Sequence, residues 1–108
     1  MGEAYVTNIT HFLDEAGELR ADMPGPARKL ASFLVLLIDA VSQRVPARDA
    51  ATGIRCRTTQ CTGSIRASLM SPDDEVAWRC PVCGHNGTIR NWQGTKWDEH
   101  SDGPQPPH

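Results

Sequence analysis

The sequence predicts an α+β fold in which an N-terminal helical segment packs on a three-stranded antiparallel sheet. Three observations lead to this prediction: two close pairs of cysteines, one apolar stretch with helical spacing, and three later stretches in which apolar and polar residues alternate. Hydrophobic residues make up 39% of the 108 residues, which is little apolar material for a core of this size. A bound metal ion is therefore expected to supply part of the stability.

Changes in composition divide the chain into three predicted parts. They are an N-terminal segment over residues 1–52, a cysteine-containing module over residues 53–97 and a disordered tail over residues 98–108. The tail is rich in Gly, Pro and Gln, which disfavours a packed structure. Residues 45–53 are expected to be the linker into the cysteine-containing module.

The main predicted helix covers about residues 26–44. Before it, residues 4–13 fit either a strand or a helical turn, because both periodicities are weak there. The stretch from Met23 to Pro26 indicates the start of the helix, since proline is favoured in a first turn. Apolar residues then recur every three or four positions, as on one face of a helix: Leu30, Phe33, Leu34, Leu37, Ile38 and Val41.

Two further apolar residues, Val35 and Leu36, widen this stripe beyond one face of the helix. A helix of that kind is covered on two sides. One side is expected to face the sheet, and the other to face the N-terminal segment or a second copy of the chain. The sequence therefore leaves open a homodimer that forms through the 26–44 helix.

Three alternating stretches predict the strands of the sheet. They lie at residues 65–69, 76–79 and 88–90, separated by a turn at residues 71–74 and by the second cysteine pair. The period of two places five apolar side chains on one face: Ile65, Leu69, Val76, Trp78 and Ile89. That face is expected to pack on the helix, and the opposite face then carries three arginines: Arg66, Arg79 and Arg90.

The three arginines form a candidate site for nucleic acid. Residues 53–97 contain six Lys/Arg against three Asp/Glu, a net charge of +3 within a chain of net charge −2. By strict alternation Trp92 joins Arg90 on the basic face, where aromatic side chains stack on the bases of a single strand. Two other interpretations stay open: acidic residues at 73–75 neutralise the arginines, or Trp92 and Trp97 fold back over the small core.

Four cysteines, Cys56, Cys61, Cys80 and Cys83, have the spacing of a tetrahedral zinc site. Each pair supplies two thiolates from one turn. In the second pair, Cys-Pro-Val-Cys-Gly, the proline stiffens the turn, and the glycine permits a positive φ that points backbone amides at the sulfurs. The first pair has four intervening residues and a wider loop. We therefore predict one structural Zn²⁺ ion held by these four residues.

Other interpretations of the same cysteines exist. Two disulfides are an alternative, but nothing in the sequence indicates secretion. Iron also fits a four-thiolate site, and a Cys-x-x-Cys pair occurs in catalytic dithiols, although a second pair nearby favours metal binding. His85 could replace one ligand, but four thiolates already complete the shell. Because a complete shell leaves no position for substrate or water, we predict that the protein is not an enzyme.

The cellular location of the protein is predicted from its first residues and from the length of its longest apolar run. The first residues lack the basic start and the small-residue cleavage site of a signal peptide. The longest apolar run, at residues 30–38, has roughly half the length needed to cross a bilayer. We therefore expect a cytoplasmic protein without a membrane partner.

The four cysteines and the alternating segments around them resemble the zinc-ribbon group of zinc fingers. The resemblance covers about residues 53–92, under half of the chain. Zinc ribbons occur in transcription factors, RNA polymerase subunits, ribosomal proteins and as appendages of enzymes, and they mostly bind nucleic acid or protein. The wider first pair departs from the commoner spacing, which argues against a rubredoxin-like electron-transfer protein. The first 52 residues, including 8–14 and 23–28, look like small uncharacterised bacterial proteins that carry such a ribbon.

Two functions follow from these expectations. The first is a non-enzymatic adaptor or regulatory module that binds nucleic acid, or a protein that handles nucleic acid, through Arg66, Arg79, Arg90 and Trp92. The second is a protein–protein interaction or homodimerisation module that acts through the 26–44 helix. The sequence does not decide between DNA, RNA and protein as the partner.

Overall fold

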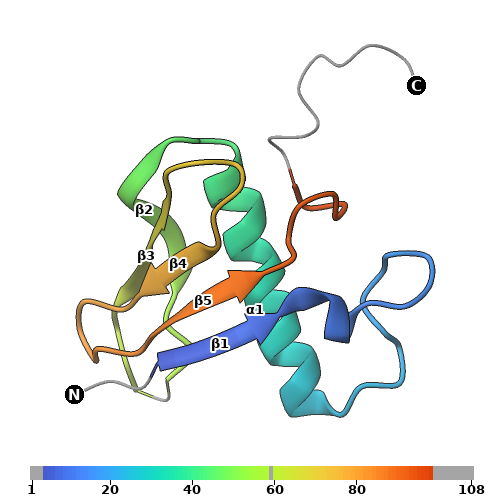
Figure 1. Ribbon diagram of the computed structural model, residues 1–108. Helices are drawn as coiled ribbons and strands as arrows, with labels where there is room; N and C mark the ends of the chain where they lie inside the picture. Colours follow the sequence, from blue (N-terminus) through green and yellow to red (C-terminus); the bar gives the residue numbers. More distant parts are fainter. Residues whose placement is uncertain (1–3, 59, 99–108) are drawn as a thin grey trace.

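The computed structural model describes residues 4–58 and 60–98, with side chains from residue 6 onward. In chain order the elements are strand β1 (Ala4–Asn8), the 3-10 helix η1 (Ile9–Phe12), helix α1 (Gly25–Ser42) and strands β2 (Ala47–Arg55), β3 (Ser64–Leu69), β4 (Val76–Arg79) and β5 (Asn86–Arg90). The predicted α+β class is therefore confirmed (Figure 1).

The strands form one sheet in the order β1-β5-β4-β3-β2. β1 runs parallel to β5, and the other neighbours are antiparallel, so the predicted meander of three strands is present as β3, β4 and β5. α1 lies across one face of the sheet, and in the described part of the chain no α-helix covers the other (Figure 1). We call this second face the open face; it presents Arg66, Ser68, Ala77, Arg79 and Thr88.

The predicted number of three strands is wrong, because two segments outside the meander add a strand at each edge. β2 forms from residues that were expected to be a linker, and β1 from the ambiguous N-terminal residues. Backbone pairing with β3 and β5 sets their positions, and neither segment needs a strong apolar alternation for that. β2 is also irregular, since Asp49 and Gly53 have positive φ values of 49° and 75° where the register with β3 shifts.

Helix α1 begins and ends within two residues of the predicted range 26–44. Pro26 lies in its first turn, and the N–H of Arg28 donates to the carbonyl of Pro24 at 2.9 Å. Among the residues that the structure describes, no helix has both the length and the apolar character needed to cross a membrane.

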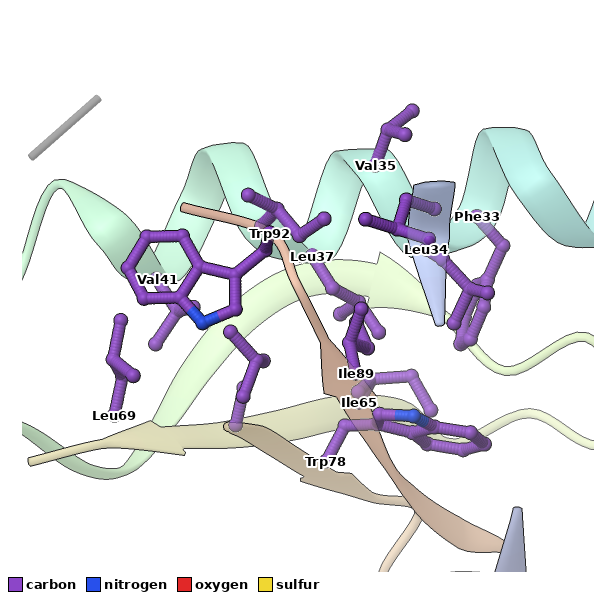
Figure 2. Packing of buried hydrophobic residues seen from close by; sticks show 14 of the residues in the cluster. Phe33, Leu34, Val35, Leu37, Val41, Ile65, Leu69, Trp78, Ile89 and Trp92 are labelled. Atoms are coloured by element: carbon purple, nitrogen blue, oxygen red, sulfur yellow. The ribbon is translucent and has the colours of Figure 1, made fainter. Parts of the chain in front are cut away.

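The apolar face of the sheet packs on α1, as the alternation predicted (Figure 2). The sheet buries all five expected side chains: Ile65, Leu69, Val76, Trp78 and Ile89. The helix buries the residues that face them: Phe33, Leu34, Leu37, Ile38 and Val41. The rings of Phe33 and Trp78 meet edge to face with their centroids 5.3 Å apart, which fixes the first half of α1 against β4.

The two residues that widen the helical stripe have different surroundings. Val35 points away from the sheet in Figure 2, yet only 5% of it is exposed. Leu36 is 52% exposed. α1 also contacts η1, so the N-terminal segment covers part of the helix beyond the sheet.

Trp92 does not lie on the open face: the strict alternation that placed it beside Arg90 is wrong, and the other interpretation, in which it folds back over the core, is confirmed. β5 ends at Arg90, and Asn91 has a φ of 59°, which breaks the alternation and turns the next side chain toward the core. Trp92 is fully buried, and its indole N–H donates to the carbonyl of Asp74 at 2.8 Å. In Figure 2 the indole lies among the core side chains between α1 and the sheet.

The first residue of the predicted tail, Asp98, belongs to the folded part. It is 2% exposed, and its carboxylate accepts the N–H of Gly94 at 2.9 Å, which closes the turn after Trp92. The rest of the predicted disordered tail, residues 99–108, lies outside the described residues.

Candidate metal centre

The four predicted ligands, Cys56, Cys61, Cys80 and Cys83, come together at one end of the sheet. Their sulfur atoms all lie within 4.8 Å of one another. The Sγ atoms of Cys56 and Cys83 are 3.6 Å apart, and so are those of Cys61 and Cys80. An ion about 2.3 Å from four sulfurs at the corners of a tetrahedron separates those sulfurs by about 3.8 Å. The four sulfurs are therefore placed to hold one metal ion.

Two strand connections supply these cysteines. Cys56 directly follows β2, and Cys61 lies in the same loop before β3. Cys80 directly follows β4, and Cys83 lies in the loop before β5. Because β2 pairs with β3 and β4 pairs with β5, both loops reverse the chain at the same end of the sheet. An ion bound by both loops would tie the two hairpins together.

Backbone hydrogen bonds set the shape of each cysteine loop. In the first loop, the N–H of Cys56 donates to the carbonyl of Gly63 at 2.9 Å, and the N–H of Gly63 donates to Sγ of Cys61 at 3.4 Å. In the second, the N–H of Cys80 donates to the carbonyl of His85 at 2.7 Å. An N–H group that points at a sulfur stabilises the thiolate, which is the form that binds metal.

Gly63 has a second role that the sequence did not reveal. A β-carbon at residue 63 would lie 2.6 Å from Sγ of Cys80 and 2.8 Å from Cγ2 of Val82. Such approaches are too close for any side chain, so only glycine fits where the two cysteine loops meet. The sequence alone does not single out Gly63, because the atoms that would clash belong to Cys80 and Val82, far along the chain.

His85 and Thr58 contact the sulfurs from outside the cluster. Nδ1 of His85 is 3.1 Å from Sγ of Cys83 and 2.9 Å from Oγ1 of Thr58. The backbone N–H of Thr58 donates to Sγ of Cys56 at 3.5 Å. Polar groups in this position orient metal ligands and adjust their basicity. Thr58 was not predicted to take part, and His85 was considered only as a replacement ligand.

The thiols differ in acidity because of these contacts. The backbone N–H and the imidazole of His85 lower the pKa of Cys83 to about 5. The N–H of Gly63 favours the thiolate of Cys61, but burial and the three neighbouring thiols outweigh it and raise the pKa of Cys61 to about 12. Four thiolates this close repel one another, so a cation between them is needed to ionise them all. The donor set therefore fits a soft or borderline cation such as Zn²⁺ or Fe²⁺.

The three predicted arginines do lie on one side of the sheet, and each is paired with a carboxylate. Arg66 and Arg79 are directly opposite each other on β3 and β4. Both donate to the carboxylate of Asp49: Arg66 through Nε at 3.2 Å, and Arg79 through Nε and Nη2 at 2.9 and 2.7 Å. Arg90 forms an ion pair with Glu75, one of the acidic residues considered for this role.

Asp49 was missed because it lies in the segment that was expected to be a linker. Its position in the bulge of β2 directs its carboxylate to the two arginines. The hydrogen bonds from Arg79 hold the pKa of the Asp49 carboxyl below its ordinary value, partial burial opposes this, and Arg66 adds to the lowering. No feature of the linear sequence marks this contact, since Arg66 and Arg79 are 17 and 30 positions away.

No protein-family model matches the chain, and no curated protein and no solved structure matches it either. The resemblance to zinc ribbons therefore rests on the four cysteines and on the distances between their sulfurs.

Proposed function

We propose that this chain is a non-enzymatic protein in which Cys56, Cys61, Cys80 and Cys83 hold one structural Zn²⁺ ion, and that its sheet binds a partner protein through the open face. The observation that carries the proposal is the set of four sulfurs within 4.8 Å, two from each hairpin loop. Four thiolates complete a tetrahedral shell, so the ion has no position for water or substrate. Zinc is proposed over iron because structural four-thiolate sites of this kind usually hold zinc.

The open face supports a role in binding. α1 covers the other side of the sheet, whereas this side carries a shallow groove of about 410 Å³ that residues of all five strands line. Val6, at the β1 edge of the groove, is 66% exposed.

A protein partner fits this face better than nucleic acid does. Asp49 and Glu75 leave a net charge of +1 over the three arginines. That charge suffices for one carboxylate, whereas nucleic-acid binding depends on contacts with several phosphates. The stacking residue of the nucleic-acid hypothesis, Trp92, is buried in the core. The proposal keeps the predicted cytoplasmic location, where thiols stay reduced.

The alternative function, a contact through α1, has less support. Of the large apolar side chains that the structure describes on α1, Leu36 is the exposed one. One exposed leucine is common on monomeric proteins and gives little area for a stable dimer.

Site-specific photo-crosslinking in the native cells tests this function. The photoreactive amino acid is placed at residue 77, in the middle of the open face, and in a matched variant at residue 29, which is exposed on α1. We expect adducts from residue 77 that a nuclease leaves intact and in which mass spectrometry identifies peptides of a second protein, and none from residue 29. Nuclease-sensitive adducts would support nucleic acid as the partner of the open face. Adducts from residue 29 alone would support partner binding through α1.

Metal analysis of the same purified protein tests the zinc site. We expect one zinc per chain in the wild type and less than one in Cys80→Ser. Iron at one per chain, or no bound metal under reducing conditions, would overturn the assignment of zinc.

A further inference from the structure

Two guanidinium groups converge on one side of the groove in the open face. Arg66 and Arg79 share the carboxylate of Asp49, and all three side chains are partly exposed, by 39%, 49% and 42% respectively. Arg79 binds both carboxylate oxygens in a fork, which is the strong bidentate arrangement of arginine and carboxylate. The cluster is therefore already arranged around a carboxylate, and it keeps a net charge of +1.

The backbone of β2 is distorted where it supplies this carboxylate. Asp49 has a φ of 49°, in the left-handed region that residues other than glycine seldom adopt. Its N–H donates to Oγ of Ser68 at 2.8 Å, and Nη2 of Arg66 donates to its carbonyl. Bulges of this kind redirect a side chain and occur often beside functional sites.

Both guanidiniums retain donors for a second carboxylate. Each uses Nε and Nη2 in its contacts with Asp49. Within residues 4–58 and 60–98, Nη1 of Arg66 and Nη1 of Arg79 make no hydrogen bond. An incoming carboxylate can therefore bind without displacing Asp49.

The floor beside the arginines is made mostly of small residues. Ser68, Ala77, Thr88 and Val6 are successive cross-strand neighbours on β3, β4, β5 and β1. Four strands at a spacing of about 4.8 Å give a row about 14 Å long, which equals about four residues of extended chain. Small side chains let a peptide backbone approach closely, and Val6 offers an apolar contact at the far end.

We propose that the groove binds an extended acidic segment of a partner protein, with one Asp or Glu side chain of that segment held by Arg66 and Arg79. This inference rests on the proposed function and adds the chemistry of the partner. Charge complementarity favours it, because the arginine cluster is positive while the row of small residues is uncharged. Asp49 orients the two guanidiniums. It also limits the affinity for the acidic segment, because its carboxylate repels the incoming negative charge.

The test is a titration of the zinc-loaded full chain, followed by amide NMR. The probe is a capped octapeptide of Ala, Ser and Val with two central Glu residues, and the matched probe has Gln in their place. We expect the Glu peptide to shift the signals of Asp49, Arg66, Ala77, Arg79 and Thr88, and the Gln peptide to bind at least about tenfold more weakly.

Variants separate this inference from a general charge effect. Arg79→Gln is expected to weaken binding of the Glu peptide by about tenfold or more. Arg79→Lys is expected to weaken it by less, because lysine keeps the positive charge and loses only the planar set of guanidinium donors. Asp49→Asn is expected to strengthen binding by about three- to tenfold. The control is Arg90→Gln, which lies outside the groove and should leave the affinity unchanged.

Three outcomes would overturn the inference. The first is equal affinity for the Glu and Gln peptides, and the second is an equal loss of affinity for the Glu peptide in Arg79→Gln and Arg90→Gln. The third is tighter binding of a capped phosphoserine peptide than of the Glu peptide. These results leave the proposed function in place if residue 77 still crosslinks to a protein. Conversely, absence of crosslinks from residue 77 would reject the proposed function whatever the peptides do.

Discussion

Gly63 and Cys80 lie so close together that a β-carbon at residue 63 would come within 2.6 Å of the sulfur of Cys80. Cys80 is itself buried, with 1% of its surface exposed, so its sulfur has little room to move away. The contact joins the two cysteine loops across the metal centre. A side chain at residue 63 would therefore have to displace the sulfur of Cys80 or the side chain of Val82.

Gly63→Ala is therefore expected to weaken metal binding and to lower the free energy of unfolding by about 1–3 kcal/mol, the usual cost of overpacking a filled site. Competition with a chelator, followed by the sulfur-to-metal absorption of the cobalt-substituted protein, measures the first effect, and thermal unfolding measures the second. Gly25→Ala is the control, because a β-carbon there meets nothing within 4 Å. Equal metal affinity in both variants would contradict this account.

Removal of the metal is expected to unfold at least residues 53–92. The two cysteine loops contain four thiols that hold no other covalent link, and the small core depends on the hairpins that these loops close. The dispersion of the amide signals should collapse when a strong chelator is added and return when zinc is restored. Unchanged dispersion in the chelator would mean that the fold does not need the ion.

Asp49 is expected to make stability depend on pH in a defined direction. The hydrogen bonds from Arg79 and Arg66 lower the folded-state pKa of its carboxyl below the ordinary value of 3.8. The unfolded chain therefore takes up the proton first as pH falls. This contribution to stability is complete above the unfolded pKa and disappears as pH falls through the lower folded pKa.

Comparison of the wild type with Asp49→Asn tests this dependence. Asparagine tolerates the left-handed backbone at residue 49, so the comparison isolates the charge. The difference in unfolding free energy should stay constant between pH 7 and pH 5, and shrink below about pH 4. Denaturant titrations down to the lowest pH at which both proteins fold measure it. A difference that stays constant down to the lowest pH would show that the folded-state pKa of Asp49 is not lowered, because stability then has no dependence on this carboxyl.

The sequence predicted the features that depend on local pattern. Four thiols with short spacing and a reversal between the pairs define the metal centre, and period-two alternation identified the buried face of β3, β4 and β5. The helix followed from its apolar spacing and from Pro26. In each case the residues that form the sequence pattern are the same residues that pack in the core or surround the metal site.

Features that depend on distant contacts could not be predicted in this way. β2 has one large apolar residue, Ile54, beside three alanines, and it is a strand because its backbone pairs with β3. Asp49 meets Arg66 and Arg79 only after that pairing forms. The alternation failed at Asn91, because one residue with positive φ reverses the direction of the next side chain.

Trp92→Ala is expected to cost about 3–5 kcal/mol of stability, the usual effect of removing a buried aromatic side chain. Trp92→Phe keeps much of the packing and loses the hydrogen bond to the carbonyl of Asp74, so it should cost less. Chemical denaturation of both variants measures these effects. If Trp92→Ala kept full stability and lost binding to a single-stranded oligonucleotide, Trp92 would be an exposed residue that stacks on bases, and its burial in the core would be contradicted.

The two neighbours on α1, Val35 and Leu36, allow a matched test of the dimer alternative. Val35 is 5% exposed, so Val35→Asp buries a charge and is expected to unfold the protein or to lower its stability by several kcal/mol. Leu36 is 52% exposed, so Leu36→Asp should change stability by no more than about 0.5 kcal/mol. Sedimentation of the wild type and of Leu36→Asp then compares their masses in solution. Identical monomeric masses agree with a helix that the sheet and η1 cover within one chain, whereas a dimer that Leu36→Asp dissociates would assign the exposed side of α1 to self-association.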